Sequence, residues 1–170
     1  MADANVYRAF ALFVQGRRIC ACTEYTPTDL KITEGVFKSG SMDTGITMDD
    51  GMEPMSTSFK VSGSDADVMG CFGFIPGKKV RFEIRSAFTD TNASQWEQVD
   101  TYDGIITAIT DDPRGIDSKT AAGQTVNVAP RYFKRVQNGK EIYEIDPIQC
   151  IRRINGVNVL ETVKNILRIN

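Results

Sequence analysis

The alternation of apolar and polar residues is the feature that most limits the folds open to this chain. In the run from Val80 to Arg85, every second residue is apolar and each residue between is charged. Successive side chains of a β-strand point to opposite faces, so this period indicates a strand with one buried face. Further runs with strand character lie at Ala9–Val14, Arg18–Tyr25, Leu30–Phe37, Met55–Ser62, Val99–Thr110, Thr125–Val136 and Lys140–Ile145. The sequence therefore predicts a mainly β protein.

Turn signals separate several of these runs. Asn138-Gly139 lies between the last two, and an Asn-Gly pair accepts the positive φ angles that a two-residue hairpin turn requires. A short turn at Gln15–Arg17 is expected to join the first two runs into another hairpin. Gly104 falls inside a long run, where a glycine indicates a bulge or a kink.

The segment after Ser62 has a helical pattern. Ser64 is the predicted N-cap, because Asp67 follows it at the spacing of a capping box. The apolar residues that follow predict a short helix that ends near Gly73.

The C-terminal segment Val159–Ile169 predicts a second helix, with Asn158 as its N-cap. Leu160, Val163 and Leu167 recur at helical spacing, and we expect this stripe to pack on the sheet. The predicted architecture is mainly β, a β-sandwich or barrel-like domain with one short internal helix and a C-terminal helix. A length of 170 residues fits a single domain over residues 1–170.

The segment 38–53 departs from the strand pattern, because it combines three glycines with several carboxylates and few apolar residues. A loop of this length is uncommon in a compact domain and is usually functional or disordered. Asp43, Asp49, Asp50 and Glu53 are candidates for a hard-cation site. Their spacing does not match the known calcium-binding loop, so a solvated loop is the preferred interpretation.

The absence of histidine excludes the Ser-His-Asp and Cys-His nucleophile systems and His-ligated metal sites. A formal net charge of −2 argues against a dedicated nucleic-acid binder. No segment approaches the roughly 20 apolar residues that cross a bilayer, and Met1–Asn5 lacks the basic start of a secretory signal. We therefore expect a protein made in a cytoplasm, with no membrane anchor. Carboxylate or lysine chemistry stays open at this point, whereas the resemblance described below implies no cofactor and no enzymatic activity.

Four cysteines remain to be explained: Cys20, Cys22, Cys71 and Cys150. They are a candidate zinc site, but structural zinc usually uses pairs separated by two to four residues, and these do not have that spacing. They also fit the role of small buried hydrophobic residues.

The C-terminal third carries the most specific motif, NGKEIYEIDP at Asn138–Pro147, followed by RINGV at Arg153–Val157 and the terminal helix. This closely resembles the major tail tube protein family of contractile-tailed bacteriophages, which is shared with R-type tailocins. The resemblance extends over nearly the whole chain, through ALFVQG at Ala11–Gly16, GSMD at Gly40–Asp43 with Ile46 and Asp49–Gly51, and FKVSG at Phe59–Gly63.

The resemblance implies a structural virion protein rather than an enzyme. Members of the family form hexameric rings that stack helically into the inner tube of a contractile tail. DNA passes through the lumen without specific binding. The implied partners are further copies of the chain, the tail sheath protein, the tape measure protein, and the baseplate and tail terminator proteins.

Segment 38–53 resembles the long glycine-rich loop of the family. Because its glycines and short polar residues cannot form a core alone, we expect an assembly loop that is disordered in free subunits and ordered in the tube. The candidate inter-subunit residues are Gly40, Met42, Asp43, Gly45, Asp49, Asp50 and Gly51. Virions leave the reducing cytoplasm at lysis, so Cys20, Cys22, Cys71 and Cys150 become candidates for disulfides between subunits.

Two alternatives stay open at the level of sequence. One is the ring protein of a type VI secretion tube, which shares the architecture. The other is a small, monomeric β-barrel that binds an apolar ligand, with segment 38–53 as its lid. Electron microscopy distinguishes rings or tubes from single small particles.

Overall fold

The structure is a computed structural model and describes residues 5–169. Most of the residues that argue against a secretory signal, 1–4, lie outside this range. The described chain is mainly β, with one short internal helix and one C-terminal helix, which confirms the predicted fold class. Its elements are β1 (Val6–Val14), β2 (Arg17–Ile19), β3 (Cys22–Thr26), β4 (Ile32–Phe37), β5 (Ile46–Met52), β6 (Thr57–Ser62), α1 (Ala66–Met69), β7 (Val80–Thr89), β8 (Gln95–Asp111), η1 (Ile116–Ser118), β9 (Gly123–Gln137), β10 (Lys140–Asp146), β11 (Ile151–Ile154), β12 (Val157–Asn158) and α2 (Glu161–Leu167).

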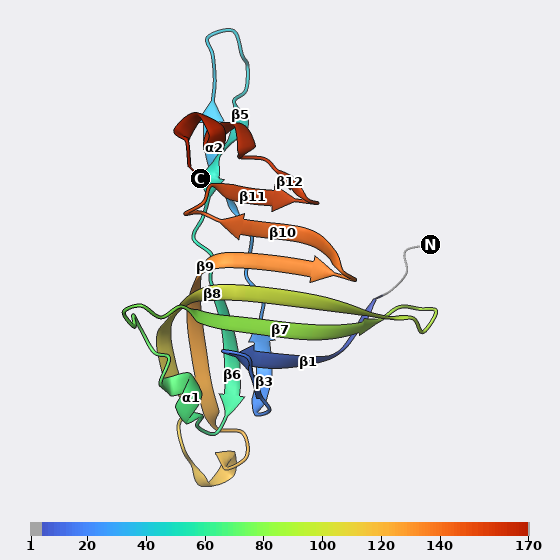
Figure 1. Cartoon of the computed structure of the whole chain (residues 1–170), viewed down its shortest axis with the longest axis vertical. Coiled ribbons are helices and arrows are strands. Elements are labelled where there is room, and N and C mark those ends of the chain that lie inside the picture. The colour runs from blue at the N-terminus through green and yellow to red at the C-terminus, as the bar shows by residue number, and fades with distance from the viewer. Residues whose placement is uncertain (1–4, 170) are drawn as a thin grey trace.

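Antiparallel strands form two connected layers (Figure 1). The long sheet has the order β12-β11-β10-β9-β8-β7-β1-β2. A short sheet consists of β3, β6, residues 123–128 of β9 and residues 106–111 of β8. Strands β8 and β9 bend from one layer into the other, so each of them belongs to both sheets.

The core lies between the two sheets. Phe82 of the long sheet and Phe59 of the short sheet are both buried, and their ring centroids are 5.8 Å apart. Val80, Phe82 and Ile84 are all buried, as their alternation predicts, and they contribute to one apolar core with Leu12 and Val126.

Two glycines permit close approach where β8 and β9 run together. A Cβ on Gly104 would meet the carbonyl oxygen of Ala129, and the register shifts between Asp103 and Gly104, which confirms the predicted bulge. A Cβ on Gly123 would meet the carbonyl oxygen of Val61 in β6.

Both predicted tight turns form. Gln15 and Gly16 have φ of 52° and 81°, and Asn138 and Gly139 have φ of 48° and 73°. Positive φ at both central residues is the requirement of the hairpin turn that matches strand twist. The predicted strand Arg18–Tyr25 is interrupted, however: β2 pairs with β1, whereas β3 pairs with β6 in the other sheet.

The helix caps differ from the prediction. Asp65, not Ser64, is the N-cap of α1, and its Oδ1 accepts hydrogen bonds from the backbone N–H groups of Asp67 and Val68 at 3.0 and 3.2 Å. Leu160, not Asn158, occupies the N-cap position of α2. Neither helix of the described residues is long and apolar enough to cross a membrane.

Candidate functional site

The hairpin β4–β5 projects from the end of the molecule that also carries α2 (Figure 1). The prediction of an irregular loop over 38–53 is wrong for Ile46–Met52, which forms β5 and pairs with β4. The pattern hid this strand because its apolar residues do not face a core. The connecting segment 38–45 forms the tip of the hairpin.

The predicted inter-subunit residues are therefore divided between two parts of this hairpin. Those at the tip are Gly40, Met42, Asp43 and Gly45, and those in β5 are Asp49, Asp50 and Gly51. Within the described residues no three carboxylates or cysteines gather to hold a metal ion. The candidate cation site and the candidate zinc site are thus not formed in this structure.

The hairpin exposes large apolar side chains. Val36 is 76% exposed, and Phe37, Ile46 and Met48 are each about half exposed. Phe37 and Ile46 lie directly opposite each other in the β4–β5 register. Val36 lies on the other face of the hairpin, opposite Thr47, so both faces carry exposed apolar side chains. Exposed apolar surface of this kind is typical of an interaction site.

An ion pair attaches the hairpin to the long sheet. Arg152 of β11 donates from Nη2 to Oδ2 of Asp49 at 2.8 Å and from Nη1 to Oδ1 at 3.3 Å. The hydrogen bonds from Arg152 and from the backbone N–H of Gly51 lower the pKa of Asp49. The Asp49–Arg152 pair therefore fixes the hairpin to the long sheet of the same subunit. The tip of the hairpin extends past this contact.

An apolar groove of about 780 Å³ lies below this attachment point. Its apolar lining includes Met52, Met55, Pro130, Ile148 and Leu160, and the charged residues Asp49, Glu53, Arg131 and Arg152 also line it. The groove connects the base of the hairpin with the start of α2, so the apolar surface continues across this end of the molecule.

The apolar residues of α2 are largely exposed, and the prediction that the apolar stripe packs on the sheet is wrong for Val163 and Leu167. Val163 and Leu167 are about half exposed, Ile166 is 74% exposed, and no residue of α2 is buried. Only Leu160, which precedes the helix, is partly buried, in the groove. Helical periodicity identifies an apolar stripe, but it does not identify what the stripe contacts.

The four cysteines are free thiols in this structure. Cys20 is exposed, whereas Cys22, Cys71 and Cys150 are half-buried. Burial raises the pKa of the Cys22 thiol to about 11, although a hydrogen bond to the backbone of Glu24 opposes the shift. A raised pKa lowers the thiolate fraction, so Cys22 is a poor nucleophile for disulfide exchange.

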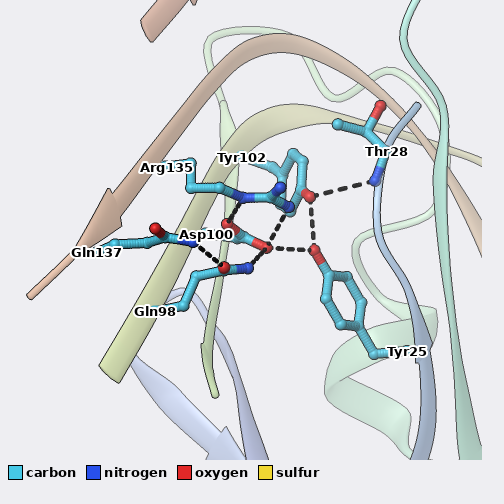
Figure 2. Close-up of polar contacts among 7 residues, drawn as sticks. All are labelled: Tyr25, Thr28, Gln98, Asp100, Tyr102, Arg135 and Gln137. Atoms are coloured by element: carbon cyan, nitrogen blue, oxygen red, sulfur yellow. Dashed lines mark hydrogen bonds and ion pairs between the residues drawn. The ribbon is translucent and has the colours of Figure 1, made fainter. Parts of the chain in front are cut away.

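A buried polar cluster that the sequence analysis missed joins β3, β8 and β9 (Figure 2). Asp100 is 1% exposed, and Arg135 donates to its two carboxylate oxygens at 2.7 and 3.0 Å. The Tyr25 hydroxyl donates to Asp100 at 2.9 Å and lies 2.5 Å from the Tyr102 hydroxyl. Gln98 completes the set with a hydrogen bond of 3.3 Å to Asp100.

This cluster satisfies its own polar groups. Burial and then the nearby Asp100 carboxylate raise the pKa of Tyr102 to about 12, and burial also raises the pKa of Tyr25. Both phenols therefore stay protonated near neutral pH and keep their hydrogen bonds. Asp100 lies on the same strand face as buried Tyr102. A charged residue at a core position of the predicted strand was therefore the sequence feature that could have indicated this cluster.

The short sheet ends in two unpaired strand edges. Within the described residues, β3 pairs only with β6, and residues 107–111 of β8 pair only with β9. An isolated bridge between Phe72 and Ile106 covers the start of that second edge. Exposed edges promote pairing with another chain, and proteins that stay monomeric usually protect them.

Comparison with known families agrees with a chain built to contact copies of itself. The family model of phage tail tube protein FII matches residues 4–167 of the 170. A search of curated proteins finds no match. Since the match spans both sheets, the β4–β5 hairpin and α2, the chain belongs to the phage tail tube protein FII family.

Proposed function

We propose that this chain forms hexameric rings that stack helically into the inner tube of a contractile phage tail, through which DNA passes. The family supports a structural role in a phage tail. The observation that carries the ring is the pair of unpaired edges on the short sheet, at β3 and at the second half of β8.

These edges support a head-to-tail ring. The edge strand β3 of one subunit pairs with the β8 edge of the next, so that the short sheets join into one continuous wall. A contact between two different patches repeats around a ring when its rotation closes, and it generates a helix when it does not.

The β4–β5 hairpin then bridges successive rings. Its apolar residues are exposed in the single chain, and its base is fixed to β11 by the Asp49–Arg152 pair. In the tube these side chains are buried against a subunit of the adjacent ring, which gives the exposed apolar surface of the hairpin a partner.

Electron microscopy and sedimentation velocity of the purified chain test this proposal. We expect six-fold rings in end views and stacked rings in side views, with large species in sedimentation. A chain that sediments as a single small species at every concentration and shows no rings contradicts the proposal.

The groove of about 780 Å³ favours a second candidate function, the binding of an apolar ligand by a monomer. That function predicts single small particles, and saturable binding of a fluorescent fatty acid that a Leu160→Arg substitution in the groove abolishes. Rings or tubes that bind no fatty acid exclude it.

A further inference from the structure

The outer face of the short sheet, which points away from the core, consists mainly of small uncharged polar side chains. In β6 the residues of this face alternate with buried Phe59 and Val61. Across the register, Ser58 lies opposite Asn127 and Lys60 lies opposite Thr125. The side chains of this face in β6, β9 and β8 are Ser58, Lys60, Ser62, Thr125, Asn127, Ala108 and Thr110, and Thr107 lies beside them at the register shift between Ile106 and Ala108.

Lys60 is the single basic residue in the four segments of the described chain that make up this sheet, 22–26, 57–62, 106–111 and 123–128. The long sheet differs, because basic residues recur on its outer face and form ion pairs there. Those pairs are Arg81–Asp103, Arg85–Glu83, Lys134–Glu141 and Arg153–Glu144.

The ammonium group of Lys60 is paired with Asp112, the residue that follows β8. Lys60 Nζ lies 2.7 Å from Asp112 Oδ2, and both side chains are about 30% exposed. The same carboxylate accepts a hydrogen bond of 3.0 Å from the backbone N–H of Gly123, and the Asp112 N–H donates to the Gly123 carbonyl at 2.8 Å. Glu24 lies opposite Lys60 in the β3–β6 register and adds a second carboxylate nearby.

The hydrogen bond from Lys60, and then that from Gly123, lowers the pKa of Asp112. The pair therefore persists to a more acidic pH than an ordinary aspartate would allow. Ion pairs at protein surfaces contribute little to stability, so folding alone gives little reason to place a lysine and a matched carboxylate here.

We propose that the outer face of the short sheet is the surface that passing DNA meets, and that Asp112 masks Lys60 so that this surface does not hold DNA. The inference rests on the proposed tube. A lysine that neutralises a phosphate releases counterions and binds DNA without regard to sequence. Every subunit of the tube carries one Lys60, so a lysine without its carboxylate partner would recur along the whole channel.

Retention of DNA by assembled tubes tests the inference. The variants are Asp112→Asn, Glu24→Gln/Asp112→Asn and Lys60→Gln/Asp112→Asn. Asparagine keeps an acceptor for the Gly123 N–H, so the end of β8 is preserved. Tubes are assembled with a short fluorescent DNA duplex, pelleted and washed at increasing salt, and the DNA that remains is measured.

We expect the two variants that free Lys60 to retain several-fold more DNA than the wild type at low salt and to lose it as salt rises. Lys60→Gln/Asp112→Asn is expected to return to the wild-type level, because the released cation is gone. Glu97→Gln is the matched control, since it removes one carboxylate from an exposed position of β8 outside the short sheet.

Each outcome has one meaning. Tubes of the freed-lysine variants that retain no more DNA than the wild type overturn the inference, as does an equal gain in Glu97→Gln or a gain that survives Lys60→Gln. Wild-type protein that forms no tubes contradicts the proposed function itself. If a variant fails to assemble, its free subunits are titrated with the same duplex at several salt concentrations. A plot of log binding constant against log salt concentration that is steeper than that of the wild type, by about 0.9 per phosphate contacted, supports the inference. An unchanged slope overturns it.

Discussion

At the scale of single residues, the Asp100–Arg135 ion pair places a buried carboxylate against a partly buried guanidinium group. Replacing Arg135 by Met leaves the carboxylate buried without its cation, and we expect a loss of about 3–5 kcal/mol in the free energy of unfolding, measured in urea. Arg85→Gln, which breaks the exposed pair with Glu83, is the control and is expected to cost less than about 1 kcal/mol. Equal losses in the two variants would contradict the role of the cluster.

Tyr102 makes the stability contributed by this cluster depend on pH in the alkaline range. Its pKa in the folded chain is about 12, whereas a tyrosine in an unfolded chain ionises near about 10. Between these values the unfolded state binds fewer protons, so the stability contributed by Tyr102 is complete below about pH 10 and falls as pH rises toward 12. Urea unfolding across this range measures the fall, and Tyr102→Phe is expected to reduce it; an unchanged slope in that variant would count against the assignment.

Residue identity predicted backbone conformation better than it predicted buried charge. Gly104 and Asn138-Gly139 could be interpreted from sequence because the conformations concerned strongly favour these residue types. The partner of Asp100 could not, since Arg135 is distant in sequence and reaches Asp100 only through the pairing of β8 with β9.

At the scale of secondary-structure elements, α2 is the helix whose apolar residues lack a contact in the subunit. Since Leu167 is exposed, we expect Leu167→Ser to change the free energy of unfolding by less than about 0.5 kcal/mol. Phe82→Ala, in the core, is the control and is expected to cost about 3–5 kcal/mol. A loss of several kcal/mol in Leu167→Ser would mean that α2 packs on its own sheet after all.

The β4–β5 hairpin is expected to affect assembly without affecting folding. Val36→Ser and Phe37→Ser remove apolar surface that is already exposed, so thermal unfolding of the subunit should be unchanged while the yield of tubes falls. Thr47→Ser, opposite Val36 in the hairpin, is the matched control. Hydrogen exchange provides a second measurement: amides of the tip, residues 38–45, are expected to become protected on assembly, and equal protection before and after would contradict the bridging role.

Elements that pack on the core of the subunit were predictable from the sequence. Elements without such a contact were not predicted correctly. Strand β7 alternates because one of its faces lies on the core. Strand β5 contains two aspartates and a glycine and lies on no core, so its sequence has the composition of a loop. The stripe of α2 was recognised, but its predicted contact was wrong because periodicity carries no information on the partner.

At the scale of the whole molecule, Cys20 is the thiol best placed to link subunits, because it is exposed and the others are half-buried. We expect denaturing gels of assembled particles, run after thiol blocking and without reductant, to show cross-linked species that reductant converts to monomer. Cys20→Ser is expected to remove them, whereas Cys22→Ser is not. Monomer alone in every lane, with four blocked thiols by mass, would leave the cysteines as unlinked thiols.

The bend of β8 and β9 through both sheets restricts how the length of the chain can vary among relatives. Inserting one residue in the middle of β9, without a bulge to absorb it, would reverse the faces of all the side chains that follow. It would move Phe133 out of the apolar core and Arg135 away from Asp100. Additions and deletions are therefore expected to accumulate in the connections outside the sheets, such as 38–45 and 112–122, while the 17 residues of β8 and the 15 residues of β9 keep a constant number.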